Sequence, residues 1–392
     1  MSVVPGIEIL AGRRASLVRG ARVGLLAHPA SIGRDFRPAA ALLAEAGARP
    51  TRLFAPEHGA LGAAQDMIGV DERRDPLTGL PVVSLYGSDE ASLAAAPEAF
   101  DGLDALVVDL ADVGARYYTF AATAIRALPA AAARGVRVIV ADRPNPLGGE
   151  DVEGNDVEPR FHSFVSELSI PNRHGLTLGE LCLWAARTRG IDVALEVVPA
   201  EGWRRADCWD ETGLPWVLPS PNMPTLDTAL VYPGMCLVEG TNLSEGRGTT
   251  RPFELAGAPW LDPGRLAARL DAFRLPGVAF RPTVFRPAFH KHAGRDCGGV
   301  QIHMTDRATF RPTLTGLAFV AACRAEDPER FGWRTETYEF VSDRLAFDLL
   351  AGGEGWRRGL EAGADPRELA CAWGPSESAF RAARADLLLY RA

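Results

Sequence analysis

The sequence lacks the residues and motifs of several common site types. Lys291 is the only lysine. No G-x-x-x-x-G-K-S/T segment occurs, which excludes a P-loop nucleotide site. Schiff-base chemistry would have only Lys291 available. No strand-like run is followed by G-x-G-x-x-G, because Gly246-Arg-Gly248 lacks the third glycine and the setting, so a nicotinamide or flavin cofactor is not expected.

Other absences narrow the class of protein. The six cysteines are scattered without a C-x-x-C pair, which favours reduced core thiols over a disulfide framework. No G-x-S-x-G occurs, and no cysteine lies in an obviously electropositive loop beside a histidine. The formal charge of −8 argues against a nucleic-acid partner. No apolar run approaches the ~18 residues of a membrane span, and no leader is visible after Met1, so we expect a cytoplasmic protein without a membrane partner. The sequence carries no signal for oligomeric state.

Length and pattern predict two domains. A chain of 392 residues is too long for one compact core. Strands alternating with helices predict a Rossmann-like, doubly wound and mainly parallel α/β sheet in residues 1–227, with a smaller α+β domain in residues 228–392. The expected strands are 22–27, 51–55, 81–85, 105–109, 136–141, 192–198, 278–285 and 298–304, and the expected helices are 38–46, 120–134, 181–189, 263–273, 313–325 and one from about 376.

The stretch Phe54-Ala-Pro-Glu-His-Gly59 joins a strand end to charged side chains. Pro56 cannot continue a central strand, because it has no N–H for the ladder. Glu57 and His58 follow at once, and Gly59 permits a tight bend behind them. Ligands of open α/β sheets bind beyond the carboxyl ends of strands. The alternative is that Glu57 caps a helix and His58 is an ordinary turn residue.

Several acids share this kind of position. Asp109, Asp112 and Asp142 also follow predicted strands, so we expect them to gather with Glu57 along one edge of the sheet. Two further acids, Glu239 and Glu245, lie in a glycine-rich segment of the second domain. Paired carboxyl groups are what glycoside hydrolysis needs, and nearby aromatics could stack on a sugar. The alternative is that the acids cap helices or pair with arginines; the residues concerned are Arg116, Arg143, Arg173 and Arg247, and the aromatics are Tyr117, Tyr118, Trp216, Tyr232 and Trp260.

Three other features have competing interpretations. His290, His292, Cys297 and His303 could form a zinc site if the first two share a strand face, although a satisfied histidine cluster is the favoured interpretation. This group defines an alternative function, a metal-dependent hydrolase; a non-catalytic saccharide-binding protein is another. Thr177 and Glu180 are spaced as a capping box, so Glu180 is expected to be structural, and Trp184 is expected in the core.

Eight ordered motifs resemble those of the NamZ family of exo-β-N-acetylmuramidases, over nearly the whole chain. The resemblance implies a Rossmann-like domain, a smaller domain and a cleft between them. It implies release of terminal MurNAc from peptidoglycan-derived MurNAc-GlcNAc saccharides without a cofactor, and Glu57 as the catalytic acid. The motifs are Phe54-Ala-Pro-Glu-His-Gly59, Asp75-Pro-Leu-Thr-Gly-Leu-Pro81, Ser84-Leu-Tyr-Gly87, Asp112-Val-Gly-Ala-Arg-Tyr-Tyr-Thr119, Asp142-Arg-Pro-Asn-Pro146, Arg173-His-Gly175, Ser220-Pro-Asn-Met-Pro-Thr225 and Glu239-Gly-Thr-Asn-Leu-Ser-Glu-Gly-Arg-Gly-Thr249.

From these segments we predict the residues of the site. Glu57 is expected to be the general acid, with His58 orienting it and either Glu239 or Glu245 as second carboxylate; the substrate's N-acetyl group could replace that carboxylate. An arginine, with Arg247 the first candidate, is expected to hold the lactyl carboxylate. The predicted substrate-binding residues are Asp112, Arg116, Tyr118, Arg143, Asn145, His174, Asn222, Asn242 and Arg247.

Overall fold

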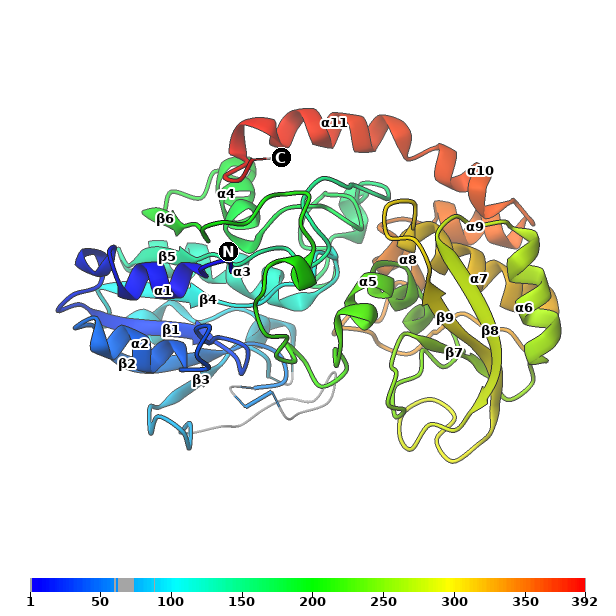
Figure 1. Ribbon diagram of the computed structural model, residues 1–392, viewed down its shortest axis with the longest axis horizontal. Coiled ribbons are helices and arrows are strands. Elements are labelled where there is room, and N and C mark those ends of the chain that lie inside the picture. Colours follow the sequence, from blue (N-terminus) through cyan, green and yellow to red (C-terminus); the bar gives the residue numbers. More distant parts are fainter. Residues whose placement is uncertain (1, 60, 63–73, 88, 392) are drawn as a thin grey trace.

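The first sheet of the computed structural model is entirely parallel, and the structure describes residues 2–59, 61–62, 74–87 and 89–391. Its strand order, β3-β2-β1-β4-β5-β6, reverses direction between β1 and β4, as in a doubly wound sheet (Figure 1). This confirms the predicted fold class. The strands are β1 (Arg22–Ala27), β2 (Arg49–Ala55), β3 (Val82–Ser84), β4 (Ala105–Asp109), β5 (Arg137–Ala141) and β6 (Leu195–Val198).

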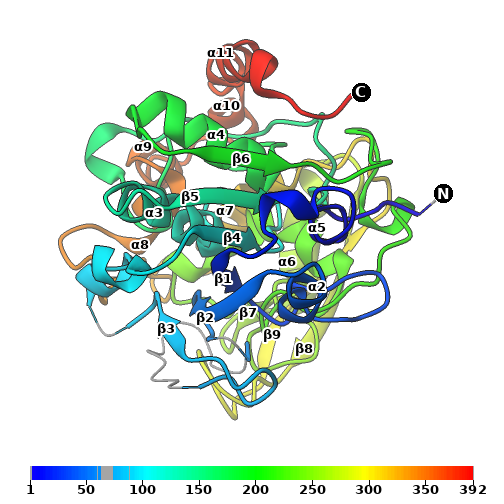
Figure 2. The same ribbon diagram turned by 90° about the vertical axis from the view of Figure 1, so that its left-hand side faces the viewer.

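Helices cover both faces of this sheet, because successive strand residues point to opposite sides. Leu25 packs in one core with residues of α1 (Gly6–Ala11) and α2 (Ala39–Glu45). Its neighbour Leu26 packs in the other core, with α3 (Thr119–Ala132) and α4 (Leu178–Arg189). Figure 2 shows the twisted sheet between these layers. Both faces being buried explains why the strands read as continuous apolar runs.

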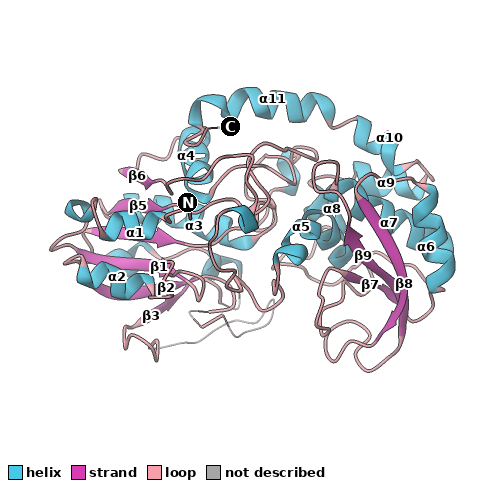
Figure 3. Cartoon of the chain, in the orientation of Figure 1, coloured by secondary structure: helices cyan, strands magenta, loops and turns pink. Residues whose placement is uncertain are grey.

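The second sheet is small and antiparallel, with strand order β7-β9-β8. It packs with several helices into the smaller domain, and loops connect its region to the first sheet (Figure 3). The strands are β7 (Leu255–Ala258), β8 (Val278–Phe285) and β9 (Cys297–Met304); the helices are α5 (Leu226–Met235), α6 (Pro263–Ala272), α7 (Pro312–Glu326), α8 (Ala346–Ala351), α9 (Gly355–Glu361) and α10 (Pro366–Cys371). Short 3₁₀ turns are η1 (Ala15–Leu17), η2 (Glu90–Leu93), η3 (Pro97–Phe100), η4 (Pro159–Phe161), η5 (Trp209–Glu211), η6 (Cys236–Gly240) and η7 (Ala385–Leu387).

The last helix, α11 (Gly374–Arg384), returns from the smaller domain to the first one (Figure 1). Phe380 of this helix lies edge-on to Trp184 of α4, at a ring-centroid distance of 5.1 Å. Arg384 donates hydrogen bonds to the carbonyl oxygens of His174 and Gly149. The C-terminal segment therefore ties the two domains together, although the sequence pattern gave it only to the second.

The capping box predicted at the start of α4 is confirmed. The Thr177 hydroxyl accepts from the Glu180 backbone N–H, and the Glu180 carboxylate accepts from the Thr177 N–H at 2.9 Å. Glu180 is fully buried and also pairs with Arg205 at 2.7 Å. Its role is structural, as expected.

Several elements were not predicted. Helices α1, α8, α9 and α10 are each only six or seven residues long, too short to show a helical period. Helix α5 contains Pro233, and β7 is four residues long with a central glycine, Gly257. The expected domain boundary at Asp227 falls in the first turn of α5.

Two predictions about the whole chain can be compared with the structure. All six cysteines are free and five are buried, which confirms reduced core thiols. Within the described part of the chain, no helix combines the length and apolar character that crossing a membrane requires.

Candidate active site

A cavity of about 470 Å³ is lined by loops from both domains. Its volume is in the range of small-molecule sites. The first domain contributes the turn after β2, the segment before α3 and the loop that contains Ser220 and Asn222. The second domain contributes η6, the glycine-rich segment that contains Arg247, and the loop between α7 and α8. The lining residues are Glu57, His58, Tyr117, Tyr118, Thr119, Val165, Ser220, Asn222, Met223, Tyr232, Glu239, Arg247, Phe253, Tyr338 and Glu339.

The turn after β2 places Glu57 and His58 at the cavity. The strand ends at Ala55, and the Gly59 N–H donates to the Pro56 carbonyl at 3.1 Å. Gly59 has a φ of +80°, as its predicted role in a tight bend requires. His58 also has a positive φ, +71°, which costs a non-glycine residue about 1–3 kcal/mol. Such strain is common at functional sites, and here it turns two polar side chains toward one space.

Glu57 is oriented by the first residue of α3. The Thr119 hydroxyl donates to Oε2 of Glu57 at 2.7 Å, and only 5% of Glu57 is exposed. The aromatic rings of Tyr117, Tyr118 and Phe253 line the same cavity. The hydrogen bond from Thr119 thus orients the carboxyl group in a buried cavity that several aromatic rings help to line.

Glu239 and Arg247 form a buried ion pair in the opposite domain. Arg247 Nη2 donates to Glu239 Oε1 at 2.8 Å, and the Tyr338 hydroxyl donates to Glu239 Oε2 at 2.7 Å. The guanidinium carbon of Arg247 lies 5.2 Å from the centroid of the Phe253 ring. Both carboxylate oxygens of Glu239 therefore accept hydrogen bonds. Glu239 and the Phe253 ring together hold the Arg247 side chain at the cavity wall.

Glu245 lies behind this pair and does not line the cavity. Its carboxylate is 3.0 Å from Lys291 Nζ, 3.1 Å from His290 Nδ1 and 3.5 Å from Arg247 Nε. Burial raises the pKa of Glu245, but the charge of Lys291 and the contacts with His290 and Arg247 outweigh it and leave the pKa below its usual range. Glu245 is an ionised structural group that supports the Arg247 side chain.

The structure leaves other predicted residues outside this cavity. Arg116 is buried and donates to the backbone carbonyls of Asn155, Ile170 and Leu350. Arg143 makes a two-pronged ion pair with Asp109. A buried guanidinium needs such partners, so these side chains build loops and are not brought to the cavity.

Three amide or imidazole side chains are likewise used within the fold. Asn145 donates to the Leu176 carbonyl at 2.9 Å, and Asn242 donates to the Arg330 carbonyl at 2.7 Å. His174 Nδ1 accepts from the Leu176 N–H at 3.1 Å, which puts its proton on Nε2. Burial and nearby arginines lower the pKa of His174 to about 3, so it is neutral.

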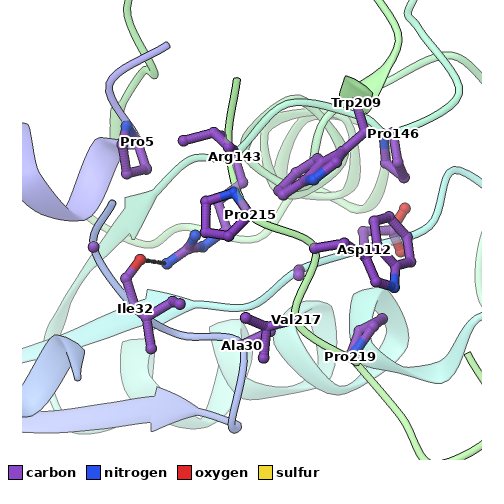
Figure 4. A pocket seen from close by; sticks show the side chains of 14 residues that line it. Pro5, Ala30, Ile32, Asp112, Arg143, Pro146, Trp209, Pro215, Val217 and Pro219 are labelled. Carbon is purple, nitrogen blue, oxygen red and sulfur yellow. Dashed lines mark hydrogen bonds between the residues drawn. The ribbon is translucent and has the colours of Figure 1, made fainter. Parts of the chain in front are cut away.

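The four acids lie at or just after the carboxyl ends of parallel strands, as expected, but they do not share one cavity. Asp109 is neutralised by Arg143, and Asp142 accepts hydrogen bonds from Thr177, Gly179 and Tyr390. Asp112 and Arg143 line a different cavity of about 450 Å³ with several prolines and Trp209 (Figure 4). Of these four acids at strand ends, Glu57 is therefore the one that lines the cavity between the domains.

Two family models match consecutive parts of the chain. Residues 23–227 match the N-terminal part, and residues 230–390 the C-terminal part, of "Exo-beta-N-acetylmuramidase NamZ". The chain belongs to the NamZ family. A relative from Bacillus subtilis (strain 168), named peptidoglycan beta-N-acetylmuramidase NamZ, is 40% identical over 390 residues, which are 99% of this chain and 91% of the relative.

Solved structures share the NamZ fold over the whole chain. Two DUF1343 family proteins from Bacteroides fragilis NCTC 9343 superpose with TM-scores of 0.87 and 0.78, at 31% and 25% sequence identity. Each match covers 100% of this chain, and 100% and 99% of the respective relative. These comparisons confirm the resemblance first seen in the motifs.

Of the NamZ motif residues predicted for the site, the structure brings six to one cavity: Glu57, His58, Tyr118, Asn222, Glu239 and Arg247. Sequence reasoning missed Tyr338 and Glu339. Glu339 accepts from the Tyr86 hydroxyl at 2.9 Å and has a φ of +46°. These two residues lie more than ninety positions beyond Arg247, in a loop that contains none of the family motifs quoted above. No signal in the sequence could have placed them in the site.

The alternative metal site does not assemble in this NamZ structure. His290 and His292 lie in a turn, not on a strand, and each has a positive φ. His292 Nε2 is bonded to the Asn242 carbonyl at 2.8 Å. Cys297 and His303 lie near opposite ends of β9. Among the described residues, no group of three histidine, cysteine or acidic side chains is placed to hold a metal ion.

Asp112 makes the stability of this protein depend on pH. Burial raises the pKa of Asp112 to about 7, and its Oδ1 has no hydrogen-bond partner. At pH values between the ordinary carboxyl pKa and this raised pKa, the folded state binds more protons than the unfolded state. The free energy of unfolding therefore falls as the pH rises through this range. We expect Asp112→Asn, which keeps an acceptor for the Gly114 N–H, to raise the free energy of unfolding by about 1–3 kcal/mol at about pH 8.

The gain should shrink at about pH 5, where the Asp112 carboxyl of the folded protein is largely protonated. Urea titrations of both proteins at the two pH values measure it. A lower stability of Asp112→Asn at the higher pH would show that the ionised carboxylate is needed by the fold.

Proposed function

We propose that this protein is an exo-acting β-N-acetylmuramidase, which releases terminal MurNAc from peptidoglycan-derived MurNAc-GlcNAc saccharides. Membership of the NamZ family and the name of the Bacillus subtilis relative support the reaction. The observation that carries the proposal is the cavity itself. Its lining includes both the glutamate of the P-E-H-G motif, Glu57, and an arginine of the second domain, Arg247.

In this proposal Glu57 is the general acid. Its protonated carboxyl gives the proton to the glycosidic oxygen as the bond between that oxygen and C1 of MurNAc breaks. The leaving sugar departs with its hydroxyl restored, and water supplies the new hydroxyl at C1. The hydrogen bond from Thr119 holds the carboxyl orientation. The strained His58 fixes the turn from which Glu57 projects.

Arg247 recognises the group that distinguishes MurNAc from GlcNAc, the lactyl carboxylate. A guanidinium can hold a carboxylate through two parallel N–H···O bonds. Ion pairs with Glu239 and Glu245 keep the Arg247 guanidinium at the cavity wall. Among the described residues that line the cavity, Arg247 is the one arginine, and there is no lysine. A neutral sugar has no carboxylate to pair with Arg247, so the arginine provides specificity.

The second carboxylate role falls to Glu339 and not to Glu239. Glu239 would have to break its bonds to Arg247 and Tyr338 before its oxygens could reach a sugar. Glu339 lines the same cavity from a strained backbone position, and its Oε2 accepts from the neutral Tyr86 hydroxyl, whereas Glu239 is paired with the charged Arg247. The second carboxyl group of a glycosidase acts as a base on water or as a nucleophile at C1, and in substrate-assisted enzymes the N-acetyl group of the substrate replaces the nucleophile. Glu339 takes the first or second of these roles, or orients the N-acetyl group in the third.

The test of the proposal is digestion of the tetrasaccharide MurNAc-GlcNAc-MurNAc-GlcNAc by the purified protein. An exo-acting muramidase first releases free MurNAc from the non-reducing end and leaves a trisaccharide. The products are separated by liquid chromatography and identified by mass spectrometry. Disaccharide products without free MurNAc would indicate internal cleavage and contradict the exo assignment.

A further inference from the structure

A second, larger groove lies beside the proposed active-site cavity. It measures about 830 Å³, against about 470 Å³ for the cavity. None of its lining residues has a role in the reaction proposed above. Its lining residues are Thr241, Asn242, His290, Lys291, His292, Trp333, Arg334, Thr335 and Glu336. We call this set the basic groove, because four of its nine members carry basic side chains.

Two paired backbone segments carry residues of both the basic groove and the cavity. The Arg334 N–H donates to the Gly240 carbonyl at 2.9 Å, and the Asn242 N–H donates to the Gly332 carbonyl at 2.9 Å. One segment runs from Glu239 in the cavity to Asn242 in the groove, three residues on. Their Cα atoms are therefore no more than about 11 Å apart, since an extended chain spans at most about 3.6 Å per residue. A sugar joined to one in the cavity lies within reach.

Trp333 gives the basic groove a fixed aromatic surface. Its indole N–H donates to Glu361 at 2.8 Å, and its ring lies 4.6 Å from the Phe347 ring, measured between centroids. The side chain is half-buried and lines the groove. A ring held on one side by packing offers its remaining surface to the apolar face of a sugar at little entropic cost.

Lys291 connects the floor of the groove to the wall of the cavity. Its Nζ donates to the carbonyls of Val238 and Glu239 at 3.2 and 3.3 Å, and to the Glu245 carboxylate at 3.0 Å. Three acceptors in different directions suit an ammonium group better than a planar guanidinium. In a chain whose other basic side chains, histidine aside, are all arginine, the lysine occurs where this geometry is needed.

We propose that the basic groove binds the sugar on the leaving-group side, an N-acetylhexosamine, with Trp333 as its stacking surface. The inference rests on the proposed function, because it assigns the terminal MurNAc to the cavity and the rest of the saccharide to the groove. The enclosed cavity takes the residue that is cleaved off, and the larger groove admits a chain that continues. The groove thereby accounts for how an exo-acting enzyme selects a disaccharide over a simple glycoside.

The test compares two substrates that differ only in the leaving group. MurNAc-GlcNAc fills both sites, whereas the methyl β-glycoside of MurNAc has no ring to place in the groove. We expect Trp333→Leu to lower kcat/KM for the disaccharide by about tenfold, the equivalent of about 1.4 kcal/mol. The methyl glycoside should change by less than about threefold on the same scale. Trp333→Phe, which keeps a ring, should recover much of the loss.

A second variant avoids any loss of packing. Thr335 is exposed and lines the groove, so Thr335→Trp should obstruct it and reproduce the selective loss. Thr305→Trp is the matched control, at an exposed threonine just after β9 that does not line the groove. Equal losses on both substrates, or no loss in either groove variant, would overturn the inference. Failure of the wild-type protein to hydrolyse either substrate would instead overturn the proposed function, and the inference with it.

Discussion

Replacing Glu57 by glutamine should lower kcat on MurNAc-GlcNAc by about 10²–10⁴-fold, the usual cost of losing a general acid. Glutamine has the same shape and still accepts the hydrogen bond from Thr119, but it cannot supply a proton to the glycosidic oxygen. KM should change little, because the cavity keeps its form. Initial rates of MurNAc release from both proteins give the two constants.

The leaving group provides the internal control for this variant. A dinitrophenyl glycoside departs without protonation, so Glu57→Gln should retain much more of its activity on that substrate than on the disaccharide. Glu239→Gln is the matched variant across the cavity, and we expect it to affect KM more than kcat, because Glu239 orients Arg247. Turnover of the disaccharide by Glu57→Gln within about threefold of wild type would remove the acid assignment.

Replacing Arg247 by methionine should lower kcat/KM for a chromogenic β-MurNAc substrate by about 10²–10³-fold. Truncating one partner of a buried, hydrogen-bonded charge pair costs about 2–5 kcal/mol. The β-GlcNAc analogue has no lactyl carboxylate to lose, so its much lower rate should change far less. The ratio of the two kcat/KM values should therefore fall sharply in the variant.

Arg251→Met is a suitable control for the arginine. Arg251 pairs with Glu254 at 3.1 Å, is partly exposed and does not line the cavity, so its loss should leave the preference for MurNAc intact. Thermal unfolding of both variants separates loss of fold from loss of recognition. If Arg247→Met lowered the rates on both sugars by the same factor, the arginine would be supporting the fold and not reading the lactyl group.

The parallel sheet was predictable because its strands are buried on both faces and read as short apolar runs. The runs at Arg22–Ala27 and Ala105–Asp109 coincide with β1 and β4, residue for residue. The elements that were missed lack such a pattern, as in α5, where Pro233 interrupts the helical sequence. The return of α11 to the first domain depends on packing between Trp184 and Phe380, which local sequence does not encode.

The site was predictable where a motif and a strand end coincide, as at Pro56-Glu57-His58-Gly59. It was not predictable where burial decides the role of a charged side chain. Asp112, Arg116 and Asn145 belong to the family motifs, yet they form hydrogen bonds with groups of their own and neighbouring loops. Glu339 shows the converse, since a loop far along the chain brings it to the cavity without any local signal.

The measurement that tests the account most directly is digestion of the tetrasaccharide MurNAc-GlcNAc-MurNAc-GlcNAc by wild type beside Glu57→Gln. We expect wild type to release free MurNAc first, leaving a trisaccharide with GlcNAc at its new non-reducing end, and the variant to release almost none. Release of GlcNAc alone, cleavage into two disaccharides, or equal digestion by both proteins would contradict an exo-β-N-acetylmuramidase with Glu57 as its acid.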